Sequence, residues 1–537
     1  MKKIYLLLTA IMLVCLTLTG CKSDEPTHEH NYNYSVVTTD PTDKEAGYTT
    51  YRCECGESYV SAGAKATEGL QYTLNADDTY TVRYLSDSYD KTIVIPSHYE
   101  GLPVVAIGDS AFKDLTISKV VIPYTVTRIG HLALCASLNF EEIEVSENNQ
   151  HFTAIDGVLY SKDTKTIVQY PIGRDDTSFE IPAHVEVIGN GAFCNATSLT
   201  SVTIPEGVTS IGTEAFKGCK AITELKLPES LTVIGDGAFE VCSNLTTINV
   251  PDSVTAIGEA AFAYCEKITE INIPVGITTI EDSTFTHCSG LKTILLPETV
   301  TGIGDYAFEW CDGLLQVQLS PALTSIGDYA FSSCKKLSHI TLPGGLTHLG
   351  EWAFSWCDNM KSVNIPSPIQ RVSGYAFYMC RSLKEIEIPE GITEIGDMAF
   401  YECDDLATVS IPSTVSLIGD CAFSRCLALN TIKVSLESEH FISVGGALYT
   451  HNGRTLIQYA IGRENESFTV SSYVDKILTC AFSGASNLIA VSFDKTNGWC
   501  AGSKEFKSED LANTVKAAYY LTSDYDYATW EQSYNNV

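Results

Sequence analysis

The sequence predicts an α+β repeat solenoid, a curved rod of stacked coils that each combine short strands with a short helix. Its 537 residues are too many for one compact core, because single cores stop growing near roughly 250–300 residues. One pattern of 23 residues recurs through most of the chain, and a unit this short buries its apolar face only by stacking on its neighbours. Eleven phenylalanines mark the register, namely Phe193, Phe216, Phe239, Phe262, Phe285, Phe308, Phe331, Phe354, Phe377, Phe400 and Phe423.

Each unit contains the elements of one coil, as residues 199–216 illustrate. Val202 and Ile204 alternate with polar residues and predict a short strand, which Pro205 ends because proline has no N–H to donate to a ladder. Gly212 is expected to supply a turn conformation that other residues find strained. The pattern Ala-Phe-x-x-Cys then predicts a short helix that places its apolar side chains on one face.

The solenoid is expected to span residues 70–494. Two pairs of consecutive units are separated by 59 residues instead of 23, so an insertion of 36 residues occurs twice. The insertions, at about 136–181 and 427–470, share a sequence pattern, and we interpret both as strand-rich variant coils. Because a solenoid needs polar end caps, residues 495–537 are expected to form the C-terminal cap, with a helix that begins at a capping Ser508.

Residues 1–20 have the features of a bacterial lipoprotein signal peptide. A short basic start precedes an apolar run that is too short for a membrane-spanning helix of about 20 residues. The string Leu18-Thr-Gly-Cys21 resembles a lipobox, and this resemblance implies that Cys21 is lipidated. We therefore expect an exported chain that is held at the bacterial cell surface through the lipid on Cys21.

Residues 21–69 are polar and are interpreted as a tether between this anchor and the solenoid. Within them His28, His30, Cys53 and Cys55 are candidate zinc ligands. The Cys-x-Cys spacing differs from the usual Cys-x-x-Cys knuckle, and there is a single pair. A small β-ribbon or a plain linker is the preferred interpretation, so the sequence predicts no metal and no cofactor.

A cysteine follows ten of the phenylalanines at the third position. Adjacent coils would place these side chains side by side in the core, with Cβ atoms near 5 Å apart, where a disulfide needs about 3.8 Å. We expect buried free thiols, with disulfides or a metal site as the alternatives. The members of this cysteine ladder are Cys219, Cys242, Cys265, Cys288, Cys311, Cys334, Cys357, Cys380, Cys403 and Cys426.

Acidic residues form a second ladder, directly after the glycine position. Stacked carboxylates suit Ca²⁺, but an Asp at the start of a short helix also caps its free N–H groups and meets the positive end of its dipole. We favour capping. The acidic ladder comprises Asp236, Glu259, Asp282, Asp305, Asp328, Glu351, Asp397 and Asp420.

Aromatic residues stand two positions before or two positions after the repeat phenylalanine in the central coils. Because helix positions four apart share a face, Tyr306 with Trp310, and Trp352 with Trp356, are expected to project together. Exposed Tyr and Trp clusters are typical of binding hot spots, whereas the alternative is lateral packing of rings between coils. The candidate binding stripe comprises Tyr264, Tyr306, Trp310, Tyr329, Trp352, Trp356 and Tyr375.

Outward-facing strand positions offer a second candidate surface. They hold mostly Thr, Ser, Asn, Gln, Glu and Lys, for example Thr247 and Asn249, and such a face can hydrogen-bond a partner or simply be soluble.

Composition excludes several function classes. Lys and Arg number 34 against 66 Asp and Glu, a formal charge of −32, which repels nucleic acid. The 11 histidines are scattered, and none recurs in register with an acid and a nucleophile. We therefore expect a protein that is not an enzyme.

The full unit, Leu-x-x-Ile-x-Ile-Pro-x-x-Val-x-x-Ile-Gly-x-x-Ala-Phe-x-x-Cys, resembles the BspA-type leucine-rich repeat. Departures are few: Glu281 and Ser373 replace the glycine, and Phe193 is followed at once by Cys194. The resemblance implies a bacterial surface protein that adheres to host matrix or plasma proteins, or to other bacteria. A glycan-binding module and a structural envelope spacer are the alternatives.

Overall fold

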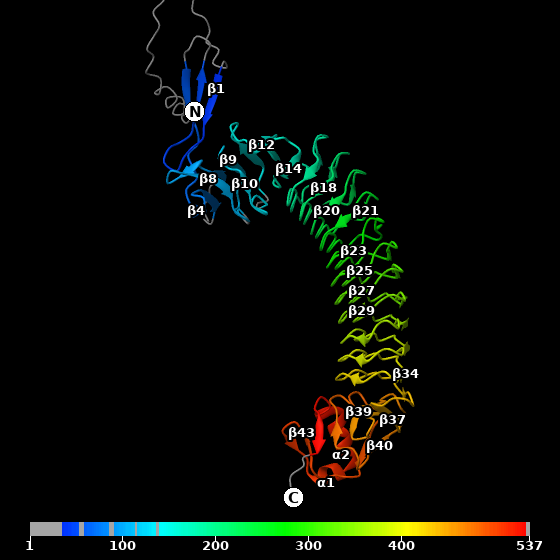
Figure 1. Ribbon diagram of the computed structural model, residues 1–537. Coiled ribbons are helices and arrows are strands. Elements are labelled where there is room, and N and C mark those ends of the chain that lie inside the picture. Colours follow the sequence, from blue (N-terminus) through cyan, green and yellow to red (C-terminus); the bar gives the residue numbers. More distant parts are fainter. Residues whose placement is uncertain (1–34, 53–57, 85–90, 113–114, 136–138, 533–537) are drawn as a thin grey trace, which may run out of the picture.

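The computed structural model describes residues 35–52, 58–84, 91–112, 115–135 and 139–532. Stacked coils follow a long arc from the N-terminal strands to a C-terminal group of strands and helices (Figure 1). The signal peptide, Cys21, His28, His30, Cys53 and Cys55 lie outside the described residues, so lipidation and zinc binding stay predictions. Among the described residues, no helix is long and apolar enough to cross a membrane.

A separate antiparallel sheet precedes the solenoid, within the segment that we interpreted as a tether. Its three strands pair in the order β1 (Ser35–Thr39), β2 (Tyr48–Arg52) and β3 (Ser58–Ala62). The solenoid then begins with eight strands, which are β4 (Leu70–Leu74), β5 (Tyr80–Tyr84), β6 (Thr92–Val94), β7 (His98–Tyr99), β8 (Leu102–Ile107), β9 (Lys119–Ile122), β10 (Arg128–Ile129) and β11 (Glu142–Val145).

Most of the regular coils give one strand to each of two rows of parallel strands, which we call sheet 1 and sheet 2, and the hydrogen-bonded pairing within each row is interrupted at several places. Partners lie one repeat apart, as when Leu225 pairs with Ile248 in sheet 1 and Ile211 with Ile234 in sheet 2. Sheet 1 contains β15 (Ser178–Glu180), β17 (Ser201–Thr203), β19 (Glu224–Lys226), β21 (Thr247–Asn249), β24 (Thr293–Leu295), β26 (Gln316–Gln318), β28 (His339–Ile340), β30 (Ser362–Val363), β32 (Glu385–Glu387), β34 (Thr408–Ile411), β36 (Thr431–Val434), β40 (Ser467–Val470) and β42 (Ala490–Phe493). Sheet 2 contains β16 (Val187–Ile188), β18 (Ser210–Ile211), β20 (Val233–Ile234), β22 (Ala256–Ile257), β23 (Thr279–Ile280), β25 (Gly302–Ile303), β27 (Ser325–Ile326), β29 (His348–Leu349), β31 (Arg371–Val372), β33 (Glu394–Ile395), β35 (Leu417–Ile418) and β41 (Lys476–Ile477).

The repeat solenoid is confirmed, but the short helix predicted in each coil is wrong. Residues 213–218 form consecutive turns in which the N–H groups of Ala215 and Lys217 bond to carbonyls three residues earlier. The intervening N–H groups of Glu214 and Phe216 bond instead to the next coil, at 2.7 Å. Glu214 has a left-handed φ of 54°, which a helix does not allow. Half of the turn's N–H groups are thus directed to the neighbouring coil, where a helix would keep them inside itself.

The role expected for the repeat glycine is also wrong. Gly327 and its equivalents do not have positive φ. An added Cβ on Gly327 would lie 2.7 Å from the N of Asp305 and 2.7 Å from the C of Gly304, both in the preceding coil. Glycine is therefore required because the backbones of adjacent coils approach closely, and not because of an unusual backbone angle.

This close approach leads to a testable expectation. Gly327→Ala should lower the free energy of unfolding by about 1–3 kcal/mol, because the added methyl group has to push two packed coils apart. Gly344→Ala is the matched control, since its Cβ would meet no atom within 4 Å and should leave stability within about 0.5 kcal/mol. Urea unfolding measures both. Equal effects of the two substitutions would contradict the close-approach explanation.

The core is one continuous column of apolar side chains. The repeat phenylalanines from Phe193 to Phe423 stack with ring centroids 5.0–5.7 Å apart. Strand residues such as Val202 and Ile211 complete it from sheets 1 and 2. All ten ladder cysteines lie in this core as buried free thiols.

Each insertion forms a hairpin and one variant coil. The first consists of β12 (Phe152–Ile155), β13 (Val158–Ser161) and β14 (Thr166–Gln169), and the second of β37 (Phe441–Val444), β38 (Ala447–Thr450) and β39 (Thr455–Tyr459). Tyr170 stacks on Phe193, and Tyr459 on Phe482, each at 5.4 Å. Tyrosine thus takes the place of the repeat phenylalanine in the variant coils.

The C-terminal segment closes the end of the solenoid with strands as well as helices. Its elements are β43 (Trp499–Ala501), β44 (Lys504–Glu505), α1 (Ser508–Ala512), α2 (Thr514–Tyr519), a π-helical turn (Tyr520–Asp524) and β45 (Trp530–Gln532). β45 pairs with β41 and β43. The expectation that Ser508 caps one continuous helix is wrong: Lys507 occupies the cap position, and Asn513 separates α1 from α2.

Candidate functional site

Four of the predicted stripe residues form a stacked column, which we call column A. Tyr306, Tyr329, Trp352 and Tyr375 come from four successive coils, with centroid separations of 5.0, 5.6 and 3.9 Å. Each has a left-handed φ between 55° and 58°, because it occupies the turn position two residues before the repeat phenylalanine. The rings therefore point away from the core and stack on each other along the solenoid.

A second stack, column B, lies two residues after the phenylalanine. It contains Tyr264, His287 and Trp310, with centroids 4.5 and 5.6 Å apart, and the ammonium of Lys335 lies 4.8 Å from the Trp310 ring. The sequence analysis missed His287, although its offset from Phe285 in the repeat could have identified it. Burial lowers the pKa of His287, so this ring is neutral at pH 7.

One of the two predicted pairs comes together. Trp352 of column A stacks on Trp356 at 5.7 Å, as expected, whereas Tyr306 and Trp310 belong to different columns. Tyr378, which was not predicted, contacts both tryptophans, with ring centroids 5.2 and 5.3 Å apart.

Exposure of the rings is partial. Tyr264, Tyr306 and Trp310 are each 39% exposed, and the other predicted stripe residues are half-buried. Neighbouring rings cover each other's faces within the columns, so ring edges and hydroxyl groups are what remains for a partner. We call the surface formed by columns A and B the aromatic surface. Its rings both pack laterally on each other and remain partly exposed.

Carboxylates surround the aromatic surface. Burial raises the pKa of Glu309, although Trp310 and Thr286 donate hydrogen bonds to it.

The acidic ladder does not cap helices: the Asp305 carboxylate accepts from the N–H of Asp328 in the next coil at 2.7 Å, and Asp328 accepts from Glu351 in the same way. In each case the backbone N–H at this turn position points toward the preceding coil, where the carboxylate accepts it. The acidic ladder therefore links adjacent coils.

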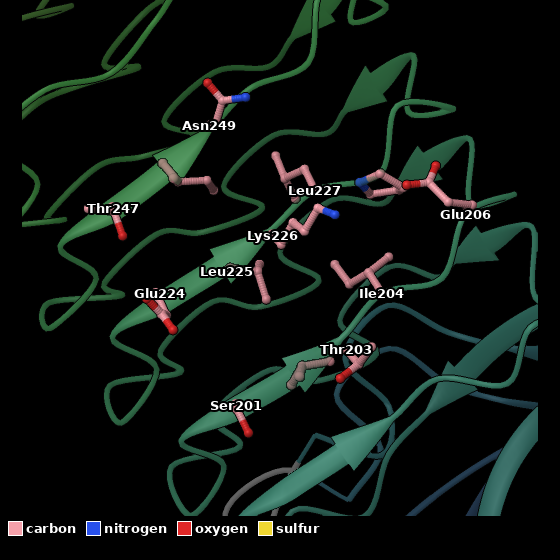
Figure 2. A pocket seen from close by; sticks show the side chains of 13 residues that line it. Ser201, Thr203, Ile204, Glu206, Glu224, Leu225, Lys226, Leu227, Thr247 and Asn249 are labelled. Atoms are coloured by element: carbon pink, nitrogen blue, oxygen red, sulfur yellow. The ribbon is translucent and has the colours of Figure 1, made fainter.

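Sheet 1 carries the second candidate surface, a hollow of about 680 Å³ over β17, β19 and β21. Figure 2 shows Ser201, Glu224 and Thr247 at one end of these strands and Asn249 at the other. β17 and β19 are neighbours but do not hydrogen-bond, so the ladder is open beneath the hollow. In the next hollow the amide of Asn272 replaces the missing strand pairing by bonding to the N–H and C=O of Val250.

The cysteine ladder has no reactive geometry. Each thiol donates to the carbonyl of the phenylalanine 26 residues earlier, for example Cys242 to Phe216 at 3.2 Å. Burial raises the pKa of Cys242 to about 12, so the thiol is protonated at neutral pH and is a poor nucleophile. No cluster of three or more metal-ligating side chains occurs within the described residues.

Comparison with known proteins places these observations in context. The sequence profile described as "BspA type Leucine rich repeat region" matches in 6 copies, at residues 90–166, 175–292, 278–406 and 347–444, which together are more than half of the chain. No curated protein matches the chain.

Solved structures of leucine-rich repeat proteins are similar to this chain. One from Bacteroides ovatus is 23% identical and covers 80% of this chain and 99% of its own, with a TM-score of 0.44. A leucine rich cell surface protein from Faecalibacterium prausnitzii is 29% identical and covers 69% and 94%, with a TM-score of 0.39. One from Eubacterium ventriosum is 21% identical and covers 60% and 95%, with a TM-score of 0.34.

Proposed function

Because the chain belongs to the BspA-type leucine-rich repeat family, we propose that it is a bacterial surface protein whose solenoid binds an extracellular protein. In this proposal residues 1–20 direct export, the lipid on Cys21 holds the chain at the cell surface, and the solenoid presents its surface to partners. The observation that carries the binding role is the aromatic surface formed by columns A and B.

Aromatic rings at these turn positions are not required by the repeat. Equivalent positions two residues before the phenylalanine hold Glu214, Gly237 and Ala260 in earlier coils, and those coils stack equally well. A group of Tyr and Trp with exposed edges is typical material for binding hot spots, because such side chains bury large area at low entropy cost. The aromatic surface therefore favours a binding role over a mere spacer.

A protein partner fits the aromatic surface better than a glycan does. Sugar rings stack on the face of an aromatic ring, and inside columns A and B the faces are occupied by neighbouring rings. Ring edges, phenol hydroxyls and nearby carboxylates remain, and these suit peptide groups together with Lys and Arg side chains. With a formal charge of −32, the chain is expected to attract partners that present a basic surface.

We expect Tyr306→Ala and Trp310→Ala together to weaken binding about 10- to 100-fold, as truncation of hot-spot residues does. The chain is screened by surface plasmon resonance against immobilised extracellular matrix proteins, plasma proteins and glycans. Tyr473→Ala is the matched control, because Tyr473 is 81% exposed and lies outside both columns. Circular dichroism verifies that each variant folds.

Each outcome of this screen discriminates between surfaces. If the double variant loses binding of a protein ligand and the control does not, the result supports the aromatic surface as the binding site. If Glu224→Ala and Lys226→Ala abolish binding instead, the site lies in the hollow on sheet 1. Binding that requires the glycans of the partner overturns the protein-binding proposal, and absence of any ligand leaves the structural spacer.

A further inference from the structure

The two insertions create equivalent junctions in the stack of coils. In the register of sheet 2, Ile167 of β14 corresponds to Ile211 of a regular coil. From there to the next core residue of sheet 1 the variant coil has 11 residues, 168–178, where the regular coil has 13, 212–224. The variant coil lacks the run of consecutive turns that residues 213–218 form in the regular coil. The turn segments on either side of the insertion meet directly as a result, and they belong to residues 59 positions apart.

A disulfide closes the second of these junctions. Cys421 and Cys480 stand two residues before Phe423 and Phe482, and they are bonded with Cα atoms 5.4 Å apart. Tyr401 lies in the same buried cluster as the two cysteines. The bridge thus joins the last regular coil before the insertion to the first coil after it.

The first junction has the same contact between turn segments. Leu132 and Gly191 occupy the positions that correspond to Cys421 and Cys480, and a Cβ on Gly191 would lie 2.7 Å from the Leu132 Cδ2. Three residues further along each segment stand Cys135 and Cys194, again 59 apart. The Cys135 Sγ lies 3.1 Å from the carbonyl oxygen of Cys194.

The two sulfurs of this junction are also neighbours of each other. The Nδ2 of Asn195 lies 3.5 Å from the Cys194 Sγ and 3.8 Å from the Cys135 Sγ, and the Cys135 side chain has the largest influence on the pKa of the Cys194 thiol. Both residues are buried. In the second junction the corresponding positions hold Ser424 and Ser483, so each junction has one cysteine pair, at alternative places in the same turn.

We propose that Cys135 and Cys194 form a second interior disulfide, which closes the first junction as Cys421–Cys480 closes the second. Two S–H bonds break and one S–S bond forms. The two protons and the two electrons pass to an external disulfide, carried by a small molecule or by a thiol–disulfide oxidoreductase, which is reduced to two thiols. The central coils are then held at both ends by covalent links.

Folding and oxidation are coupled at this pair. The neighbouring Cys135 side chain, together with burial, raises the pKa of the Cys194 thiol, and the thiolate is the species that attacks a disulfide. The folded protein with reduced thiols therefore reacts slowly, and the bridge forms fastest while the chain is still folding. This order suits a chain that folds after export into an oxidising compartment.

Peptide mapping tests the proposal directly. The full chain, purified without reductant and alkylated before digestion with trypsin, should contain a peptide pair that links residues 129–162 to 175–217 and separates on reduction. The pair 385–425 linked to 477–495, which contains Cys421 and Cys480, is the positive control. Complete alkylation of Cys135 and Cys194 alongside an intact control pair would overturn the proposal, as would a bridge from Cys135 to Cys219.

A stability measurement gives independent evidence. In the Cys421→Ser/Cys480→Ser variant, reductant should lower Tm by about 5 °C, since the remaining bridge closes a long loop. A variant with all four cysteines changed to Ser is the matched control and should not respond to reductant. Identical insensitivity of both variants would argue decisively against the second bridge.

Discussion

Phe331→Ala should lower the free energy of unfolding of the surrounding coils by about 3–5 kcal/mol, the range for truncating a buried phenylalanine. Phe331 is fully buried and stacks on Phe308 at 5.1 Å and on Phe354 at 5.4 Å. The ring therefore contributes to the interfaces with both neighbouring coils, and each coil of a solenoid is stabilised mainly by such nearest-neighbour interfaces.

Urea unfolding followed by tryptophan fluorescence measures this loss where it occurs, because Trp310 and Trp352 lie in the coils before and after Phe331. Leu315→Ala is the control, since Leu315 is 54% exposed and its truncation should change stability by no more than about 0.5 kcal/mol. A Phe331→Ala variant within about 1 kcal/mol of the wild type would contradict the account of the core as a continuous column.

Loss of the Cys421–Cys480 disulfide should lower the stability of the C-terminal coils by about 4 kcal/mol, the entropy expected for a closed loop of this length. The bridge spans 59 residues and encloses the second insertion. We expect Cys421→Ser/Cys480→Ser to expose residues 427–532 to limited proteolysis at a lower urea concentration than in the wild type.

The matched control for this prediction is Cys334→Ser, which alters a buried free thiol of the ladder and closes no loop. It should leave the proteolysis of residues 427–532 unchanged. Equal proteolytic sensitivity of the bridged protein and the double variant would show that the bridge adds nothing to the packing of the cluster around Trp499 and Trp530.

The coil register could be predicted from the sequence because it depends on spacing alone. Phenylalanines one repeat apart must lie above one another once the coils stack, and the ring column follows directly. The position of each strand was predictable for the same reason, since alternation and Pro205 define its ends without reference to other coils.

What depends on contacts between coils could not be predicted in this way. The Ala-Phe-x-x-Cys spacing is helical within one unit, but the N–H of Phe216 bonds to Ala238 of the next coil, and single-unit periodicity contains no information on that bond. The repeat glycine was misinterpreted for the same reason, because its close neighbours Asp305 and Gly304 belong to another coil.

The candidate site was predictable in outline only. Offsets from the phenylalanine identified the seven stripe residues, but the assumed helix paired Tyr306 with Trp310, where the turn gives each its own column. Cys421 and Cys480 share an offset and a separation of 59 residues; that coincidence was visible in the sequence. Their contact, however, depends on the missing turn of the variant coil, which only the structure reveals.

The disulfide at the second junction also governs how the molecule responds to force. A protein held at one end and bound to a partner at the other is stretched whenever the two bodies separate. Unfolded chain extends by roughly 3.5 Å per residue, so the 59-residue segment closed by Cys421–Cys480 would add roughly 200 Å of length if it opened. With the bridge intact this segment cannot extend, because the tension passes directly from Cys421 to Cys480 through the disulfide.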